Sequence, residues 1–222
     1  VEVVIAYDPD KTTKHLNPIY ESATWAKDFD VIIHDECSSD VKDLALIDRI
    51  LEPHRKGLPG VLLHCGMHSY RSEGYPDAVT PWFEFTGVRS TKHGPQVPIE
   101  ISFLGKLNSN EPSFPIIQGF ADWKTINEEL YNNESSKLLD SATPLARGKQ
   151  TYKTKQGAEV VDEATVVWTN NYRNAARVFA TTLGHHNATV QDERYLDLVT
   201  RGLLWSCDKL NDDYLLKADE KF

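Results

Sequence analysis

The sequence predicts an α/β fold with a mostly parallel central sheet, flanking helices and an irregular insertion in the middle of the chain. One observation is the apolar run after Gly60, which ends abruptly at His64 and Cys65 within residues 60–71, GVLLHCGMHSYR. Such a run is typical of a buried central strand that leaves the sheet in a sharp turn. A second observation is the helical pattern that separates this run from the apolar run before it. Strand, helix and strand in this order indicate a parallel pair with a right-handed crossover.

Length and composition indicate a single soluble globular domain over residues 1–222. Hydrophobic residues make up 40% of the chain and charged residues 26%, and no apolar run approaches the roughly 18 residues that span a bilayer. The formal charge of −9 argues against a nucleic-acid partner or an anionic membrane surface, because both recruit clustered Lys and Arg. The three cysteines form no disulfide framework.

The chain opens on VEVVIAYD, already inside a predicted strand and without an initiator Met. We therefore expect the domain to lack an upstream strand. The compartment stays open between the cytoplasm and, if a signal peptide has been removed, the periplasm or the cell exterior. Formation of a homo-oligomer stays open as well.

The first third of the chain reads as strands joined by a loop and a helix. Residues 1–7 alternate as a strand, and residues 8–22 form a polar loop with two prolines. Residues 29–34, FDVIIH, form the next strand, and residues 60–63 form the central one. The helix between them has an apolar face with three- and four-residue spacing, made by Val41, Leu44, Ile47 and Leu51.

The ends of this helix have recognisable signals. Ser38, Ser39 or Asp40 can cap its beginning, because their side-chain oxygens accept hydrogen bonds from free backbone amides. Pro53 perturbs the last turn, and Gly57 can end it.

The middle third is less regular. Residues 97–103, 125–131 and 137–142 have the pattern of strands in an appended layer. Residues 107–115 are rich in Asn, Ser and Pro and indicate a loop, and residues 148–159 indicate a polar hairpin or loop.

The last third predicts two strands, residues 165–169 and 177–182, joined by the turn TNNYRNA. A long helix follows, capped by Thr189 with Asp192 three residues later. Its expected buried stripe consists of Leu196, Val199, Leu203, Cys207 and Leu210. The charged tail, residues 212–222, is expected to be peripheral.

Four polar clusters end or follow predicted strands: Asp35-Glu36, His64 to His68, His93, and His185-His186. In open α/β sheets, ligands bind outside the carboxyl ends of the strands, so several of these clusters should meet at one edge. Histidine suits acid–base chemistry near neutral pH and is a common metal ligand. The candidate catalytic residues are His64, His185 and Glu129. The candidate substrate-binding residues are Glu36, His68, His93, Tyr131 and Tyr172.

Each candidate also has a plain structural alternative. His64 could be a buried histidine bonded to a backbone carbonyl, and Cys65 a small buried thiol rather than a nucleophile. Glu129 could lie on a charged edge strand, although alternation puts it on the same face as Tyr131. Glu36 could belong to a helix N-terminus, where the helix dipole favours negative charge.

Several stretches together resemble the trehalose-utilisation (ThuA-like) proteins. They are FDVIIHDE, GLPGVLLHCGM, KHGP, NEELY, VVWTNNYRNAARVFATTLGHH and YLDLVTRGLLWS, and they cover most of the chain in the family's order. The resemblance implies a flavodoxin-like fold related to class I glutamine amidotransferases. It places His64 where amidotransferases carry the nucleophilic cysteine, His185 near the triad histidine and Asn187 near the triad glutamate. It therefore argues against a glutaminase. The family's opening strand and its Gly-His-type motif have no counterpart here.

The resemblance implies carbohydrate catabolism, with trehalose, related disaccharides or their 3-keto derivatives as substrates. One hypothesis is a lyase, hydrolase or isomerase that works by acid–base chemistry and needs no cysteine nucleophile; no cofactor is certain. A second adds a divalent metal such as zinc, with His64, His93, His185 and Glu36 as candidate ligands. A third is a non-catalytic sugar- or partner-binding domain on a degenerate amidotransferase scaffold.

Overall fold

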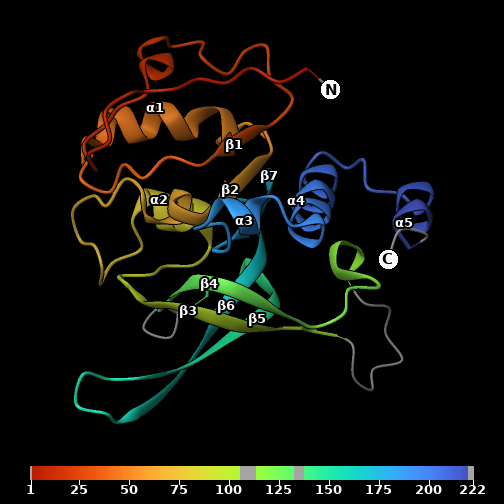
Figure 1. Ribbon diagram of the computed structural model, residues 1–222. Coiled ribbons are helices and arrows are strands. Elements are labelled where there is room, and N and C mark those ends of the chain that lie inside the picture. The colour runs from red at the N-terminus through yellow and green to blue at the C-terminus, as the bar shows by residue number, and fades with distance from the viewer. Residues whose placement is uncertain (1, 106–113, 133–137, 220–222) are drawn as a thin grey trace.

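The central feature of the fold is one mixed β-sheet (Figure 1). The structure is a computed structural model that describes residues 2–105, 114–132 and 138–219. Within these residues, seven strands form the sheet in the order β1-β2-β7-β6-β5-β3-β4. The strands are β1 (Ile32–His34), β2 (Gly60–Leu63), β3 (His93–Phe103), β4 (Trp123–Tyr131), β5 (Ala142–Lys153), β6 (Glu159–Tyr172) and β7 (Ala176–Thr181).

Helices pack on both faces of this sheet. The α-helices are α1 (Leu44–Arg55), α2 (Pro81–Thr86), α3 (Asn187–Val190), α4 (Glu193–Ser206) and α5 (Asp212–Asp219). Short 3-10 helices are η1 (Pro18–Glu21), η2 (His64–His68) and η3 (Pro115–Ile117). Among the described residues, no helix combines the length and apolar character of a membrane-spanning segment.

Strand β2 lies at the centre of the parallel part of the sheet. It pairs in parallel with β1 and with β7, and Leu63 lies opposite Thr181. The α1 crossover between β1 and β2 confirms the predicted strand–helix–strand unit. The ends of β2 and β7 therefore meet at the same edge of the sheet.

The prediction of a mostly parallel sheet is wrong, because the other pairings are antiparallel. The middle of the chain joins the same sheet as β3, β4 and β5 instead of forming a separate layer. Strands β5 and β6 make a long hairpin whose tip projects away from the helices (Figure 1). Strands β5, β6 and β7 follow one another through short turns, and strands joined in this way can pair only in antiparallel.

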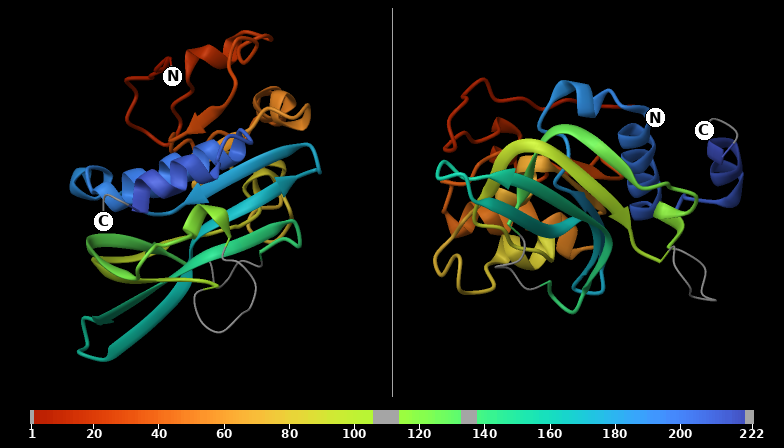
Figure 2. Two further views of the ribbon diagram at one scale, coloured as in Figure 1. Left: turned by 90° about the vertical axis from the view of Figure 1, so that its right-hand side faces the viewer. Right: turned by 60° about the horizontal axis from the view of Figure 1, so that its bottom comes forward.

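Side chains alternate between two cores along the central strands. Leu62 and Val178 pack with α1 and α2, whereas Val61 and Phe179 pack with α4 on the other face. Helix α4 lies close against β7 (Figure 2), and a Cβ at Gly202 would be only 2.3 Å from the Phe179 ring. Glycine at this position therefore sets the distance between helix and sheet.

Two predicted strands are absent from the described residues. Residues 2–7 have no regular secondary structure, and Ile5 is 84% exposed. The alternating pattern alone is insufficient, because a strand also needs a partner, and β1 is the outer strand of the sheet on this side. Residues 138–141 form no strand, since β5 begins at Ala142; residue 137 and residues 107–113 of the predicted loop lie outside the described part. Residues 148–159 contain the β5–β6 turn, as the hairpin alternative predicted.

Both long helices begin later than predicted. Asp43 caps α1 through the Ala45 and Leu46 amides, and Asp192 caps α4 through the Arg194 amide. Ser38, Ser39, Asp40 and Thr189 are therefore not the caps. The buried face of α4 is also shifted: Leu196 is 48% exposed, while the buried residues are Tyr195, Leu198, Arg201, Gly202 and Ser206.

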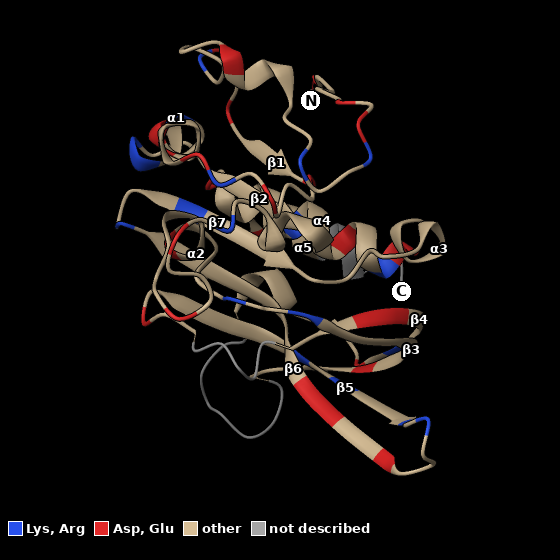
Figure 3. Cartoon of the chain, turned by 90° about the vertical axis from the view of Figure 1, so that its left-hand side faces the viewer, with Lys and Arg blue, Asp and Glu red and all other residues tan. Residues whose placement is uncertain are grey.

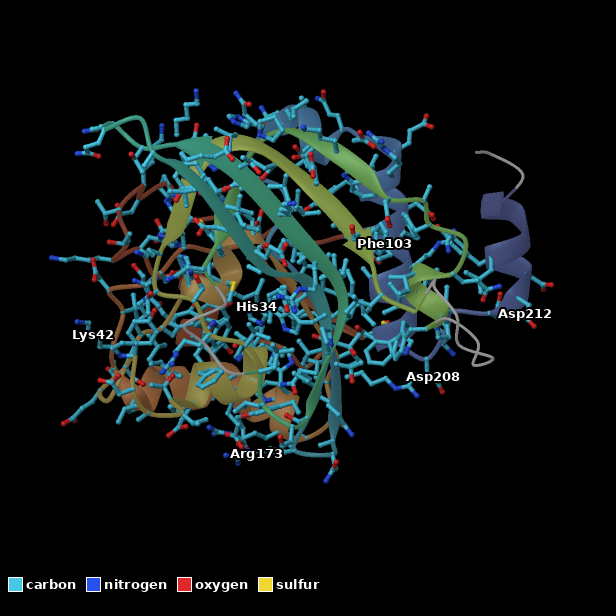
Figure 4. All side chains as sticks on the ribbon, turned by 90° about the horizontal axis from the view of Figure 1, so that it is seen from below. His34, Lys42, Phe103, Arg173, Asp208 and Asp212 are labelled. Atoms are coloured by element: carbon cyan, nitrogen blue, oxygen red, sulfur yellow. The ribbon has the colours of Figure 1, made fainter. Side chains whose placement is uncertain are left out.

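A carboxylate that is only 14% exposed, that of Glu36, ties the end of β1 to the segment after β2. Its Oε1 atom accepts hydrogen bonds from Tyr20 Oη at 3.0 Å, Tyr70 Oη at 2.9 Å and His34 Nδ1 at 2.9 Å. Burial opposes the charge on Glu36, but His34 and these hydrogen bonds outweigh it and lower the pKa of the carboxyl to about 2. Figure 4 places His34 in the interior of the molecule.

The hydrogen bonds assign a charge to His34. The Leu58 carbonyl can only accept, so His54 Nδ1 donates to it at 2.7 Å and His54 Nε2 is left as an acceptor. His34 Nε2, 3.1 Å from that atom, therefore donates to it, while Nδ1 donates to Glu36. Burial lowers the pKa of His54 to about 3, which agrees with its neutral role. The result is a buried ion pair between His34 and Glu36.

This ion pair predicts a specific loss of stability in acid. The folded pKa of Glu36 is about 2 against 4.5 for an ordinary glutamate, so its contribution is complete above pH 4.5 and is lost as the pH falls toward 2. We expect Glu36→Gln to lower the free energy of unfolding by roughly 3 kcal/mol at neutral pH. The gap to wild type should shrink as the pH falls through this window. Denaturant unfolding at several pH values checks this.

The matched control is Glu21→Gln, which changes an exposed glutamate on η1. Its free energy of unfolding should follow that of wild type at every pH. A constant gap between Glu36→Gln and wild type from pH 7 to pH 2 would contradict a charged Glu36.

Candidate functional site

His64 stands directly after β2 in a sharp, strained turn. Its φ of 40° lies in the left-handed region that non-glycine residues rarely adopt. Two residues later, a Cβ at Gly66 would be 2.4 Å from the His34 carbonyl oxygen, so only glycine fits there. The turn directs the His64 side chain toward β7, where Nδ1 donates to the Thr182 carbonyl at 2.8 Å.

Strand β4 supplies a carboxylate and a phenol to the same place. Glu129 Oε2 lies 3.7 Å from His64 Nε2, and Tyr131 Oη lies 3.2 Å from that nitrogen. The predicted common face of these two side chains is therefore present. Figure 3 shows the acidic end of β4, where the Glu129 side chain is only 8% exposed.

His185 completes a three-membered centre. Its Nδ1 atom lies 3.3 Å from Glu129 Oε2 and 3.4 Å from His64 Nε2. These three side chains are far apart in sequence, yet they meet beyond the carboxyl ends of β2 and β7. In the part of the chain that the structure describes, they form the one group of three whose nitrogen and oxygen ligand atoms could share a metal ion.

Glu128 holds the turn that carries His185. Its buried carboxylate accepts the backbone amides of His185 at 3.1 Å and His186 at 3.4 Å. Alternation along β4 points Glu128 and Glu129 in opposite directions, so the adjacent carboxylates have different tasks. No prediction assigned a role to Glu128. The signal in the sequence is a pair of adjacent acidic residues, Glu128 and Glu129, on one strand.

Gln96 on β3 is a second residue that sequence reasoning missed. Its amide nitrogen donates to Glu129 Oε1 at 3.0 Å and lies 2.9 Å from His185 Nε2. His93, on the same strand, has Nδ1 3.7 Å from Glu129 Oε1, and its side chain is 45% exposed. No local motif identifies Gln96, because its role depends on the pairing of β3 with β4.

The electrostatics of the centre favour a charged His64. Burial opposes protonation, but the Cys65 sulfur, the Thr182 carbonyl and the Glu128 carboxylate outweigh it and raise the pKa of His64 to about 9. Cys65 Sγ is 3.5 Å from Tyr131 Oη. Its contacts with the Cys37 thiol and with His64 lower the pKa of Cys65 despite its burial.

The structure separates two predicted site residues from this centre. Tyr172 ends β6 beside the start of β7, at the opposite edge of the sheet, where its hydroxyl accepts a hydrogen bond from Arg55. Figure 4 places its neighbour Arg173 at the periphery. Glu36 is committed to its own buried network and is not a member of the three-residue group. Both residues stand in sequence patterns that are typical of a functional site, but the pairing of the strands places their side chains away from the centre of His64, Glu129 and His185.

His68 does lie beside the centre. It is 7% exposed, and its ring stacks on Tyr131 with centroids 4.2 Å apart and planes 5° apart. His186 contributes its backbone amide to Glu128. The predicted cluster at the edge of the sheet therefore contains His64, His68, His93, Glu129, Tyr131 and His185.

Comparisons with known proteins agree with this architecture. A family model described as trehalose utilisation (ThuA) matches residues 12–206. A solved ThuA-like protein from Parabacteroides merdae ATCC 43184 is 19% identical, with a TM-score of 0.58 over 82% of this chain and 71% of that one. Another from Bacteroides uniformis ATCC 8492 is 15% identical, with a TM-score of 0.58 over 85% of this chain and 74% of that one. None of the curated proteins matches this chain.

The role of Glu128 predicts a local change when its carboxylate is removed. Glu128→Ala should speed hydrogen exchange of the His185 and His186 amides by about tenfold or more, because each loses a charge-assisted hydrogen bond. Glu128→Gln, which keeps one oxygen acceptor, should have a smaller effect. Exchange measured by NMR or mass spectrometry tests this.

Glu100→Ala is the control, since Glu100 is exposed on β3 and pairs with Lys124. It should leave exchange at residues 185 and 186 unchanged. Equal exchange rates in wild type and Glu128→Ala would show that the turn does not depend on Glu128.

Proposed function

This chain belongs to the ThuA (trehalose-utilisation) family, and we propose that it is an enzyme of carbohydrate catabolism. Its substrate would be a disaccharide or related sugar, or the 3-keto derivative of one. The chemistry would be proton transfer at the centre formed by His64, Glu129 and His185. The single observation that carries the proposal is the meeting of two imidazoles and one carboxylate within 3.7 Å of one another.

Each group has a defined part in this chemistry. A proton on a carbon next to a ketone is acidic enough to be removed by a carboxylate or an imidazole. Glu129 is suited to accept it, because Gln96 and His185 hold its two oxygens in place. His64 is suited to donate a proton to the developing oxyanion, because the Thr182 carbonyl holds its ring with Nε2 facing the centre. Elimination, hydration and isomerisation all fit this arrangement.

A thioester mechanism has less support. The strained position after β2 carries the His64 imidazole, and the Cys65 thiol follows it and contacts Tyr131. An amidotransferase nucleophile would occupy the strained position itself. We therefore propose a lyase, hydrolase or isomerase rather than a glutaminase.

Turnover of 3-keto-disaccharides tests the proposal. His64→Gln and Glu129→Gln should each lower the rate by about a hundredfold to ten-thousandfold, because each removes one side of the proton transfer. Product formation followed by NMR measures the rate. Tyr172→Phe, at the opposite edge of the sheet, should leave it unchanged.

Two results would count against the proposal. One is turnover that survives His64→Gln, which would show that His64 is not the proton donor. The other is sugar binding without any turnover by the wild-type protein, unaffected by His64→Ala and His185→Ala, which would support the non-catalytic binding domain instead.

A second candidate is a divalent metal centre at the same three atoms. They form a triangle with sides of 3.3, 3.4 and 3.7 Å, so the point equidistant from them lies about 2.0 Å from each. Zinc binds histidine nitrogen and carboxylate oxygen at about 2.0–2.2 Å, with three protein ligands in catalytic sites. The metal-ligand set would then be His64, Glu129 and His185, without Glu36 or His93. A bound zinc would polarise a ketone or activate a water molecule.

Metal analysis separates the two candidates. A metal centre predicts one zinc ion per chain in protein purified without a His-tag, and rebinding after chelation. His185→Ala and Glu129→Gln should weaken that binding by at least about tenfold, whereas His93→Ala should leave it unchanged. Zinc titration by calorimetry gives both values. Zinc affinity that is unchanged in His185→Ala, or the absence of a stoichiometric metal, would rule this candidate out.

A further inference from the structure

The segment that follows His64 contains unpaired buried polar atoms. His68 Nε2, Arg71 Nε and Ser72 Oγ each have no hydrogen-bond partner among the described residues, although all three atoms are buried. Native proteins pair the large majority of such atoms with protein groups, ordered water or a ligand. Of these three residues, Arg71 lines a pocket. His68 is 7% exposed and therefore cannot find water at the open surface.

This segment is firmly held, so the unpaired atoms belong to a defined surface. The Tyr70 amide donates to the Ser38 carbonyl at 3.0 Å, and Ser69 Oγ donates to the Glu36 carbonyl at 2.6 Å. Trp82 Nε1 donates to the Gly66 carbonyl at 2.9 Å. The Tyr70 hydroxyl also holds the segment, because it donates a hydrogen bond to Glu36.

Arg71 lines a small pocket that carries positive charge. Its guanidinium carbon lies 4.9 Å from the centre of the Tyr75 ring, and no acidic residue of the described chain forms an ion pair with it. The pocket also contains Arg89 and the hydroxyl-bearing Ser69 and Ser90, and it has no Asp or Glu in its lining. In a protein of net charge −9, such a pocket selects for an anionic group.

His68 does not line the pocket, but it lies close to Arg71 on one side and to the proposed catalytic centre on the other. One face of its ring stacks on Tyr131, whose hydroxyl reaches His64 Nε2 at 3.2 Å. Burial, followed by the nearby Arg71 charge, lowers the pKa of His68 to about 3, so the ring is neutral at physiological pH. A neutral imidazole can donate one hydrogen bond to a ligand oxygen without adding charge.

We infer that Arg71 forms a subsite for an anionic oxygen group, either a carboxylate or a phosphate, on the sugar. The planar guanidinium binds two oxygens of such a group at once, which gives both affinity and orientation. The sugar part of this inference rests on the proposed function, whereas the anion part rests on the pocket. The substrate class would be a sugar acid or a sugar phosphate.

Calorimetry with matched probes tests the subsite. Glucuronate and glucose 6-phosphate carry the two kinds of anion, glucose carries none, and inorganic phosphate carries no sugar. Wild-type protein should bind at least one of the two anionic sugars about tenfold or more tightly than glucose, and the pair identifies which anion is preferred. Arg71→Gln should abolish this preference. Arg147→Gln removes an exposed arginine of β5 and should retain it.

The outcomes are distinguishable. Equal affinity for glucose and both anionic sugars in wild type, or an unchanged preference in Arg71→Gln, would overturn the subsite. If Arg71→Gln does not fold, Arg71→Lys keeps the charge but loses the two-oxygen geometry, and an intact preference there would overturn it as well. Inorganic phosphate that competes with glucose 6-phosphate only when Arg71 is present supports it. His64→Gln should keep the preference even if it removes turnover, so failure of the proposed chemistry leaves this test intact.

Discussion

The parallel register between β2 and β7 is the constraint on which the site depends. Leu63 lies opposite Thr181, so the residues that follow both strands emerge at one edge of the sheet. The His64 side chain spans this edge and donates to the Thr182 carbonyl at 2.8 Å. A register shift of one residue would turn side chains to the other face and break this contact. The two histidines of the centre can meet only because this pairing holds.

The antiparallel half of the sheet adds the acidic component. Strand β4 is the outer strand on the far side, yet its end curls back toward the β2 turn and presents Glu129 and Tyr131 to His64. The adjacent Glu128 holds the backbone of the His185 turn. One strand end therefore supplies a group suited to chemistry and a group that positions its partner. A neighbouring ion pair, His34 with Glu36, ties the end of β1 to the segment after β2, because Glu36 also accepts a hydrogen bond from the Tyr70 hydroxyl.

Local sequence patterns predicted the central strand and several residues of the site. The apolar run before His64 identified the central strand, and polar residues at strand ends identified His64 and His185. Alternation with Tyr131 identified Glu129, and the structure brings these residues together. Patterns could not reveal which strand pairs with which, and that pairing decides the remainder. It brings Gln96 to Glu129, sends Tyr172 to the opposite edge and makes the middle of the chain part of one mixed sheet. The alternating residues 1–7 also failed as a predictor, because residues 2–7 lack a partner strand.

Distances between imidazole rings in solution test the convergence itself. In protein with isotope-labelled histidine and tyrosine, ring-proton NOEs are expected between His64 and His185, whose centroids lie 5.4 Å apart, and between His64 and Tyr131 at 5.1 Å. The His34 and His54 rings, 5.3 Å apart in the separate buried network, serve as the internal reference. Detection of all three contacts would establish the centre. Detection of the reference contact without either His64 contact would contradict it.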